Sequence, residues 1–103
     1  MKIKIHNDVW KVKLVDANAK KMNPDPDSYN FGLTEYKELL ISIMDGRSES
    51  VTRSTLIHEL VHAFMFSYGH TVEGEEAMCD FFGVHGDEII DLTNQIIERW
   101  GDR

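Results

Sequence analysis

The N-terminal residues alternate between apolar and polar side chains. Ile3 and Ile5 alternate with lysines, a polar triplet occupies residues 6–8, and the alternation resumes up to Val15. A period of two is typical of strands with one buried face, and the polar triplet supplies a turn between them. The pattern predicts a β-hairpin.

Two further apolar stretches predict strands at residues 31–35 and 39–44, joined by the segment 36–38. Residues 23–28 read Asn-Pro-Asp-Pro-Asp-Ser, a composition that favours an exposed loop. Residues 16–22 are expected to form a turn of helix or a loop. We therefore expect an N-terminal antiparallel β-sheet of three or four strands.

The pattern changes to a helical period near residue 50. The residues that share one face of this predicted helix are Leu56, Leu60, Ala63, Phe64 and Ser67. The helix is expected to span residues 50–68 and to end at Gly69. A second helix is predicted over residues 73–82, followed by an interruption at 83–86 and a third helix with Asp87 as its N-cap. Strands followed by three helices predict one α+β domain over residues 1–103.

The charge and the cysteine content narrow the possible partners and the compartment. The 103 residues carry a formal charge of −7, which disfavours binding to phosphate backbones and to anionic lipid. We therefore expect no nucleic acid and no membrane among its partners. Cys79 is the only cysteine, and the N-terminus has no apolar stretch typical of a signal peptide. These features favour a cytoplasmic protein.

Two histidines and a glutamate lie within the predicted central helix, in the segment His-Glu-Leu-Val-His at 58–62. Residues four apart lie on the same helical face, so the imidazoles of His58 and His62 converge and can share a metal ion. Glu59 is rotated away from them, which suits a general base that reaches a water on the metal better than a third ligand. Zinc is expected from this ligand set, with manganese and iron as the alternatives.

A zinc site needs a third protein ligand, and a catalytic site leaves the fourth position open. In a metzincin, a glycine and a histidine would follow at positions 65 and 68. This chain has Met65 and Tyr68 there, so that class is excluded. His70 and His85 are conceivable ligands.

The preferred third ligand lies in the second predicted helix. Glu76 and Asp80 are four residues apart and share one helical face. We expect Glu76 to bind the metal and Asp80 to orient one of the two histidine ligands through its far nitrogen. Glu75 and Glu73 are the alternatives for the third ligand.

The motif HELVH at 58–62 followed by EEAMCD at 75–80 resembles the gluzincins, whose pattern is HExxH and then a helix bearing ExxxD. Glu76 and Asp80 match the marked positions of the second element. Residues 32–63 also resemble small phage and prophage metallopeptidases of the ImmA/IrrE-like group. The resemblance implies a minimal zincin-like core and an intracellular zinc peptidase; some members of the group cleave repressors.

The expected activity is hydrolysis of a protein or peptide substrate with one zinc ion per chain. Zinc lowers the pKa of its bound water to about 7, and Glu59 would take the proton during attack on the carbonyl. The strand at 39–44 is a candidate edge for pairing with an extended peptide. Tyr68, His70 and His85 are candidates for an additional oxyanion donor. The alternative is a catalytically inactive, metal-stabilised protein-binding or regulatory module.

Overall fold

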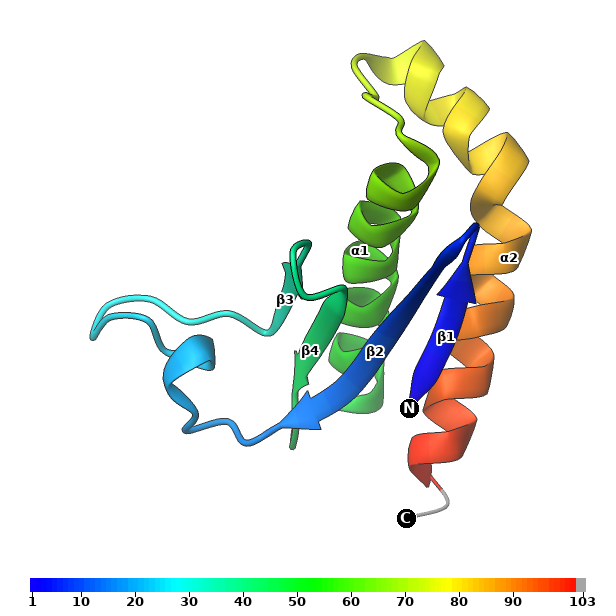
Figure 1. The fold of residues 1–103 in the computed structure, drawn as a ribbon. Coiled ribbons are helices and arrows are strands. Elements are labelled where there is room, and N and C mark those ends of the chain that lie inside the picture. The colour runs from blue at the N-terminus through cyan, green and yellow to red at the C-terminus, as the bar shows by residue number, and fades with distance from the viewer. Residues whose placement is uncertain (102–103) are drawn as a thin grey trace.

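The computed structural model, which describes residues 1–101, contains a four-stranded sheet and two α-helices (Figure 1). The strand order in the sheet is β1-β2-β4-β3. The strands are β1 (Lys2–Ile5), β2 (Asp8–Val15), β3 (Gly32–Glu35) and β4 (Leu40–Met44). Each lies within a residue or two of its predicted position.

The predicted hairpin is confirmed, because β1 and β2 pair antiparallel with Ile5 opposite Asp8. The turn between them passes through His6, whose φ of 55° lies in the left-handed region. The alternation buries Ile3, Ile5, Trp10 and Val12. It exposes Lys2, Lys4, Lys11 and Lys13 on the opposite face of the hairpin.

The prediction of an antiparallel sheet is wrong, because the sheet is mixed. β2 and β4 pair in parallel, from Lys11 opposite Leu40 to Val15 opposite Met44, while β3 and β4 pair antiparallel. Two parallel strands must be joined by a long connection, and residues 16–39 form it here. Within this connection the chain first forms β3 at the edge of the sheet and then returns as β4 between β3 and β2. β4 therefore has strands on both sides and no free edge for a peptide.

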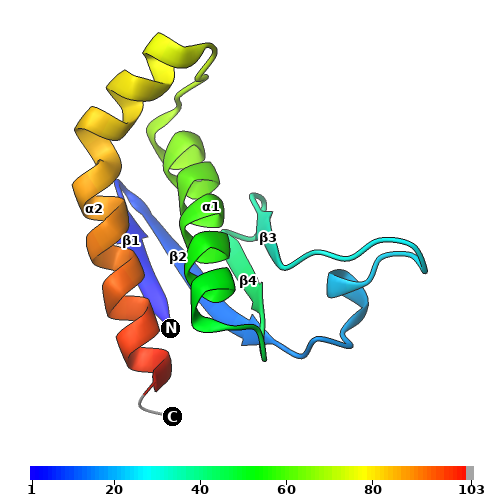
Figure 2. The ribbon, with the colours of Figure 1, turned by 180° about the vertical axis from the view of Figure 1, so that it is seen from behind.

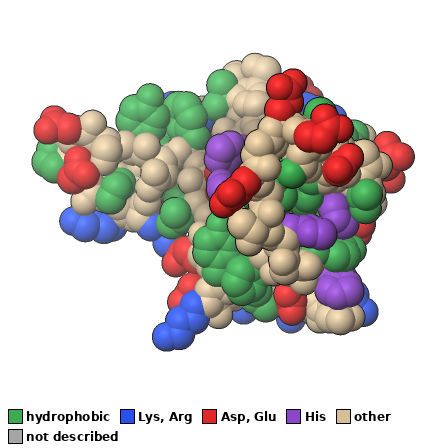
Figure 3. Space-filling view, turned by 90° about the horizontal axis from the view of Figure 1, so that it is seen from above, with side chains coloured by type: hydrophobic (Ala, Val, Ile, Leu, Met, Phe, Trp, Pro, Cys, Tyr) green, Lys and Arg blue, Asp and Glu red, His purple; other side chains and the backbone are tan. Residues whose placement is uncertain are grey.

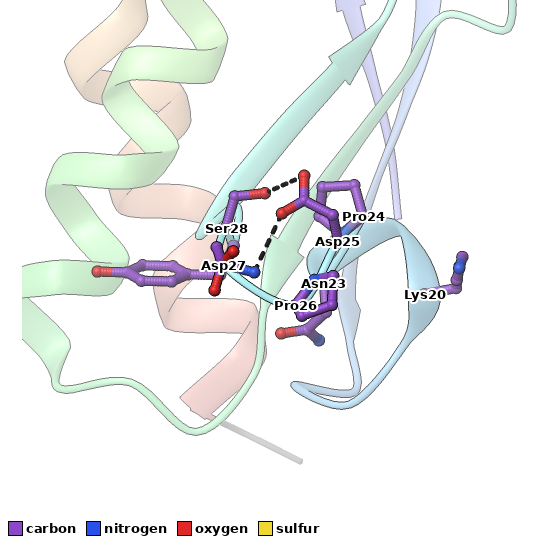
Figure 4. A pocket seen from close by; sticks show the side chains of 8 residues that line it. Lys20, Asn23, Pro24, Asp25, Pro26, Asp27 and Ser28 are labelled. Atoms are coloured by element: carbon purple, nitrogen blue, oxygen red, sulfur yellow. Dashed lines mark hydrogen bonds between the residues drawn. The ribbon is translucent and has the colours of Figure 1, made fainter.

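The crossover includes a segment, residues 16–31, that projects from the rest of the molecule (Figure 1). It contains a short 3-10 helix, η1 (Lys20–Met22), and the exposed loop predicted at 23–28. In that loop the Asp25 carboxylate accepts hydrogen bonds from the Asp27 backbone N–H at 3.1 Å and from the Ser28 hydroxyl at 2.8 Å (Figure 4). The Lys21 ammonium pairs with Glu35 of β3 at 2.8 Å and ties the projecting segment to the sheet.

The first helix, α1 (Glu49–Tyr68), confirms the prediction for residues 50–68. Ser48 caps its N-terminus by accepting a hydrogen bond from the Val51 N–H at 3.2 Å. Gly69 ends it with a φ of 70°, a conformation that favours glycine. Local signals at both ends thus define α1.

The prediction of three helices is wrong, because the segments expected to form the second and third helices belong to one helix, α2 (Glu75–Gly101). Gly83 and Gly86 lie inside it, and Asp87 is an exposed interior residue instead of an N-cap. The buried side chains continue along one face on both sides of the glycines: Phe81, His85, Ile89, Thr93 and Ile96. Packing of this continuous face offsets the cost of about 1 kcal/mol for each helical glycine.

Both helices cover the same face of the sheet, with α2 beside β1 (Figures 1 and 2). The core lies between this face and the helices and includes Trp10, Ile41, Leu60, Phe64 and Ile89, each fully buried. The expected α+β class therefore agrees with the structure. Neither helix in residues 1–101 is both long and apolar enough to cross a membrane.

Candidate metal centre

His58 and His62 lie on the side of α1 that faces away from the core. At about 100° of rotation per residue, they lie roughly opposite the buried Leu60 and Ala63. The His58 side chain is 68% exposed, His62 is half-buried, and their ring centroids are 4.9 Å apart. The helix therefore presents two imidazoles side by side at its surface.

Glu59 is almost completely buried next to these two histidines, with 7% of its surface accessible. Its two carboxylate oxygens have different neighbours. Oε1 accepts a hydrogen bond from the Thr34 hydroxyl of β3 at 2.8 Å, and Oε2 lies 4.0 Å from His58 Nε2. Thr34 thus orients the carboxylate so that its second oxygen points toward the histidines.

Gly32 allows β3 to approach α1 closely enough for this contact. A Cβ atom at this position would lie 2.6 Å from Thr55 Cγ2 and 2.9 Å from Glu59 Cγ, both too short for van der Waals contact. Gly32 and Thr34 are two residues apart in β3 and therefore share the face of the strand that meets α1. The position of the Glu59 carboxylate depends on both residues.

The three residues lie close enough together to be candidate ligands of one metal ion. Each of His58, Glu59 and His62 offers one ligand atom, and these atoms all lie within 4.8 Å of one another. Two imidazole nitrogens and a carboxylate oxygen form a ligand set that zinc commonly adopts in proteins. Within residues 1–101, no other group of three or more His, Cys, Asp or Glu side chains meets this criterion.

An open groove runs beside the centre, between the projecting segment and α1. It has a volume of about 550 Å³ and is lined by residues 29–32 on one side and by Ser54, Thr55, His58 and Glu59 on the other. Seen from above, histidine side chains lie in separate parts of the surface, some beside the projecting segment and others farther from it (Figure 3). The groove gives the Glu59 side of the helix room for an extended ligand.

The structure does not bring Glu76 or Asp80 to this group. α2 packs on the opposite flank of α1, where His85 contacts the rings of Phe64 and Tyr68. Glu76 is an exposed residue in the first turn of α2, beyond the end of α1, as is its alternative Glu75. The assignment of Glu76 as third ligand stays a prediction.

Asp80 lies on the same flank as His85. It lines a cavity with His70 and His85, and among the described residues it forms no hydrogen bond with His58 or His62. The proposed role of Asp80 in orienting one of those two ligands also stays a prediction. His70, His85 and Tyr68, considered as oxyanion donors, all gather on this α2 flank.

Sequence reasoning did not identify Thr34 or Gly32 as parts of the site. Their spacing of two in a strand places them on one face, but nothing local shows that this face meets Glu59. That contact joins residues 25 positions apart and arises only when β3 packs against α1.

Comparison of the chain with protein-family models, with curated proteins and with solved structures found no match. The functional argument therefore depends on the geometry of the residues themselves.

Proposed function

We propose that the protein is a zinc-dependent metallohydrolase, specifically a cytoplasmic peptidase of the small phage or prophage type that its sequence resembles. The observation that carries the proposal is the placement of Glu59. A buried carboxylate is costly unless it has partners, and this one is held by Thr34 with its other oxygen 4.0 Å from Nε2 of the exposed His58. A helix stabilised by packing alone has no use for this arrangement.

The residues present suit each part of the reaction. A zinc ion held by His58 and His62 would supply a water with a pKa near 7 and would polarise the scissile carbonyl. Glu59 Oε2 accepts the proton as water attacks the carbonyl carbon and then gives it to the leaving amine. Thr34 keeps Oε1 occupied, so that the same oxygen remains in position for both transfers.

β3 is the preferred docking edge for a peptide substrate. It is one of the two edge strands of the sheet, its neighbour in the sheet is β4, and it lies against Glu59. An extended peptide that pairs with this edge would continue the sheet and pass beside the groove formed by the projecting segment. Main-chain pairing would position the peptide, and the groove would accept its side chains.

One observation favours the alternative, a metal-stabilised module without activity. Because the Glu59 carboxylate lies within 4.8 Å of both histidine ligand atoms, it is also placed to act as the third ligand. In that case no general base remains in the group. The two functions thus differ in a single role, that of Glu59.

The substitution Glu59→Gln distinguishes them. For a peptidase, we expect the zinc content to equal that of the wild type while turnover of a quenched fluorescent peptide library falls by about 10²–10⁴-fold. For the module, the variant binds one zinc ion per chain fewer than the wild type. Glu49→Gln is the matched control because Glu49 is an exposed glutamate in the first turn of the same helix. If Glu59→Gln retains zinc and wild-type turnover, the peptidase proposal is wrong.

A further inference from the structure

A second pair of histidines meets on the α2 flank of α1. His70 follows the C-terminus of α1, and His85 lies within α2. Their Nε2 atoms are 3.3 Å apart, and their ring centroids are 5.4 Å apart. Two nitrogens that bind one tetrahedral zinc ion at about 2.0–2.1 Å are separated by roughly 3.3–3.4 Å. The observed spacing therefore fits a shared ion.

We propose that His70 and His85 form a second metal site, separate from His58 and His62, that takes Zn²⁺ through the two Nε2 atoms. Imidazole nitrogens are ligands that zinc prefers. The site does not depend on the proposed peptidase activity, because none of the residues of the first centre takes part in it. Water completes the coordination, together with any carboxylate that reaches the ion.

The surroundings of His85 hold its ring in place for this role. His85 is 6% exposed and lies against Tyr68 at 4.5 Å and Phe81 at 5.0 Å between ring centroids. Rings packed on several sides have little freedom to rotate, so little conformational entropy is lost when a metal binds. His70 is exposed and can adjust to the ion.

The cavity beside the pair has room and charge for a cation. Its volume is about 240 Å³, and Asp80 lines it together with His70 and His85. The first turn of α2 adds the carboxylates of Glu75 and Glu76 to this end of the molecule. Acidic side chains are visible on the side toward α2 in Figure 3. This local negative charge favours a bound cation.

The protonation state of His85 also suits metal binding. Burial lowers the pKa of His85, and the neighbouring His70 lowers it further, while Glu88 acts in the opposite direction. A histidine must be neutral to bind a metal, and a lowered pKa keeps the ring neutral near pH 7. The competing explanation of the 3.3 Å contact is a hydrogen bond between two neutral imidazoles, which needs no metal.

Zinc binding by a variant that lacks the first centre tests the proposal. The His58→Ala/His62→Ala variant is dialysed against zinc, and the excess zinc is then removed. Elemental mass spectrometry is expected to find one zinc ion per chain in this protein. Adding His70→Gln is expected to abolish that binding. Adding His6→Gln instead is the control, because His6 stacks on Tyr68 at 4.5 Å but is not one of the pair. His70 is exposed, so its replacement is compatible with folding.

Imidazole resonances provide a second measurement on the same protein. Zinc added to His58→Ala/His62→Ala protein is expected to shift the Nε2 signals of His70 and His85 and to leave those of His6 unchanged. The proposal is overturned if the double variant binds no zinc, if His70→Gln leaves its zinc content unchanged, or if the two Nε2 signals do not respond. Any of these results would assign the contact to a hydrogen bond. Failure of the peptidase assay would leave this test unaffected.

Discussion

The two flanks of α1 carry histidines in contrasting environments. On the flank toward β3, His58 is 68% exposed and lies at an open groove, and the buried group is the carboxylate of Glu59. On the flank toward α2, His85 is buried among aromatic rings and its partner His70 is exposed. Access to solvent and a positioned carboxylate suit the catalytic role that we propose for the first pair, whereas the buried ring of His85 suits the second ion that we propose. The comparison teaches that two histidine pairs close to one helix can differ in burial, in partners and in access to solvent.

Removing a histidine on the β3 flank is expected to have the largest effect. His62→Ala leaves His58 without the ligand one helical turn away, and zinc binding at this centre and peptide turnover should both be lost. Metal content by elemental mass spectrometry and turnover of the peptide library measure the result. Unchanged turnover in the variant would refute a catalytic role for this flank.

The same assay tests the third ligand predicted from the sequence. Glu76→Gln is expected to lower the zinc content by one ion per chain if Glu76 is the third ligand, whereas a loss in Glu75→Gln alone would assign that role to the alternative, Glu75. Wild-type zinc content in both variants would rule out both residues and leave Glu59 as the carboxylate in the group.

Gly32→Ala should disturb the β3 flank and leave the α2 flank intact. The added methyl group meets Thr55 Cγ2 at 2.6 Å and Glu59 Cγ at 2.9 Å, and overpacking of this kind costs about 1–3 kcal/mol. We expect a lower free energy of unfolding in urea and a lower turnover. Gly83→Ala is the control: it meets nothing within 4 Å and lies in a helix, so it should stabilise the protein by up to about 1 kcal/mol without changing turnover.

Thr34→Val sharpens the comparison further, because it removes the hydroxyl that donates to Glu59 Oε1 at 2.8 Å and to the Glu59 backbone carbonyl at 3.3 Å. The side chain keeps its shape, so the fold should be retained. Loss of a side chain that hydrogen-bonds to a residue of a metal site typically lowers metal affinity or activity by about 10–100-fold. We expect kcat to fall by an amount toward the lower end of that range, with zinc content unchanged. A variant with wild-type kcat would show that Glu59 needs no support from β3.

The smallest expected effect is a pH dependence of stability on the α2 flank. The pKa of His85 is lowered in the folded state, so the unfolded state binds more protons as the pH falls below the ordinary histidine value of 6.5. In metal-free protein, the free energy of unfolding should therefore decrease as the pH falls through this region. His85→Gln should show a smaller decrease, measured by urea unfolding at several pH values. An equal decrease in both proteins would assign the dependence to other groups.

Local patterns predicted most of the secondary structure. Alternation identified the β1–β2 hairpin, and the helical period with Gly69 as its end identified α1 nearly to the residue. Because His58 and His62 are four apart on that helix, their convergence also followed from the sequence. Gly83 and Gly86 misled the prediction for α2, since a local helix breaker carries no information about the long packed face that spans it.

The sequence by itself determined the elements whose cause lies within a few residues: the strands, helix α1, and the pairing of two histidines with a glutamate beside them. Only the tertiary structure decided the parallel pairing of β2 with β4, the hydrogen bond from Thr34 to Glu59, and the meeting of His70 with His85. These contacts join residues far apart in the chain. Their formation depends on how the sheet and both helices bury one common core, and the periodicity of a single segment does not encode that arrangement.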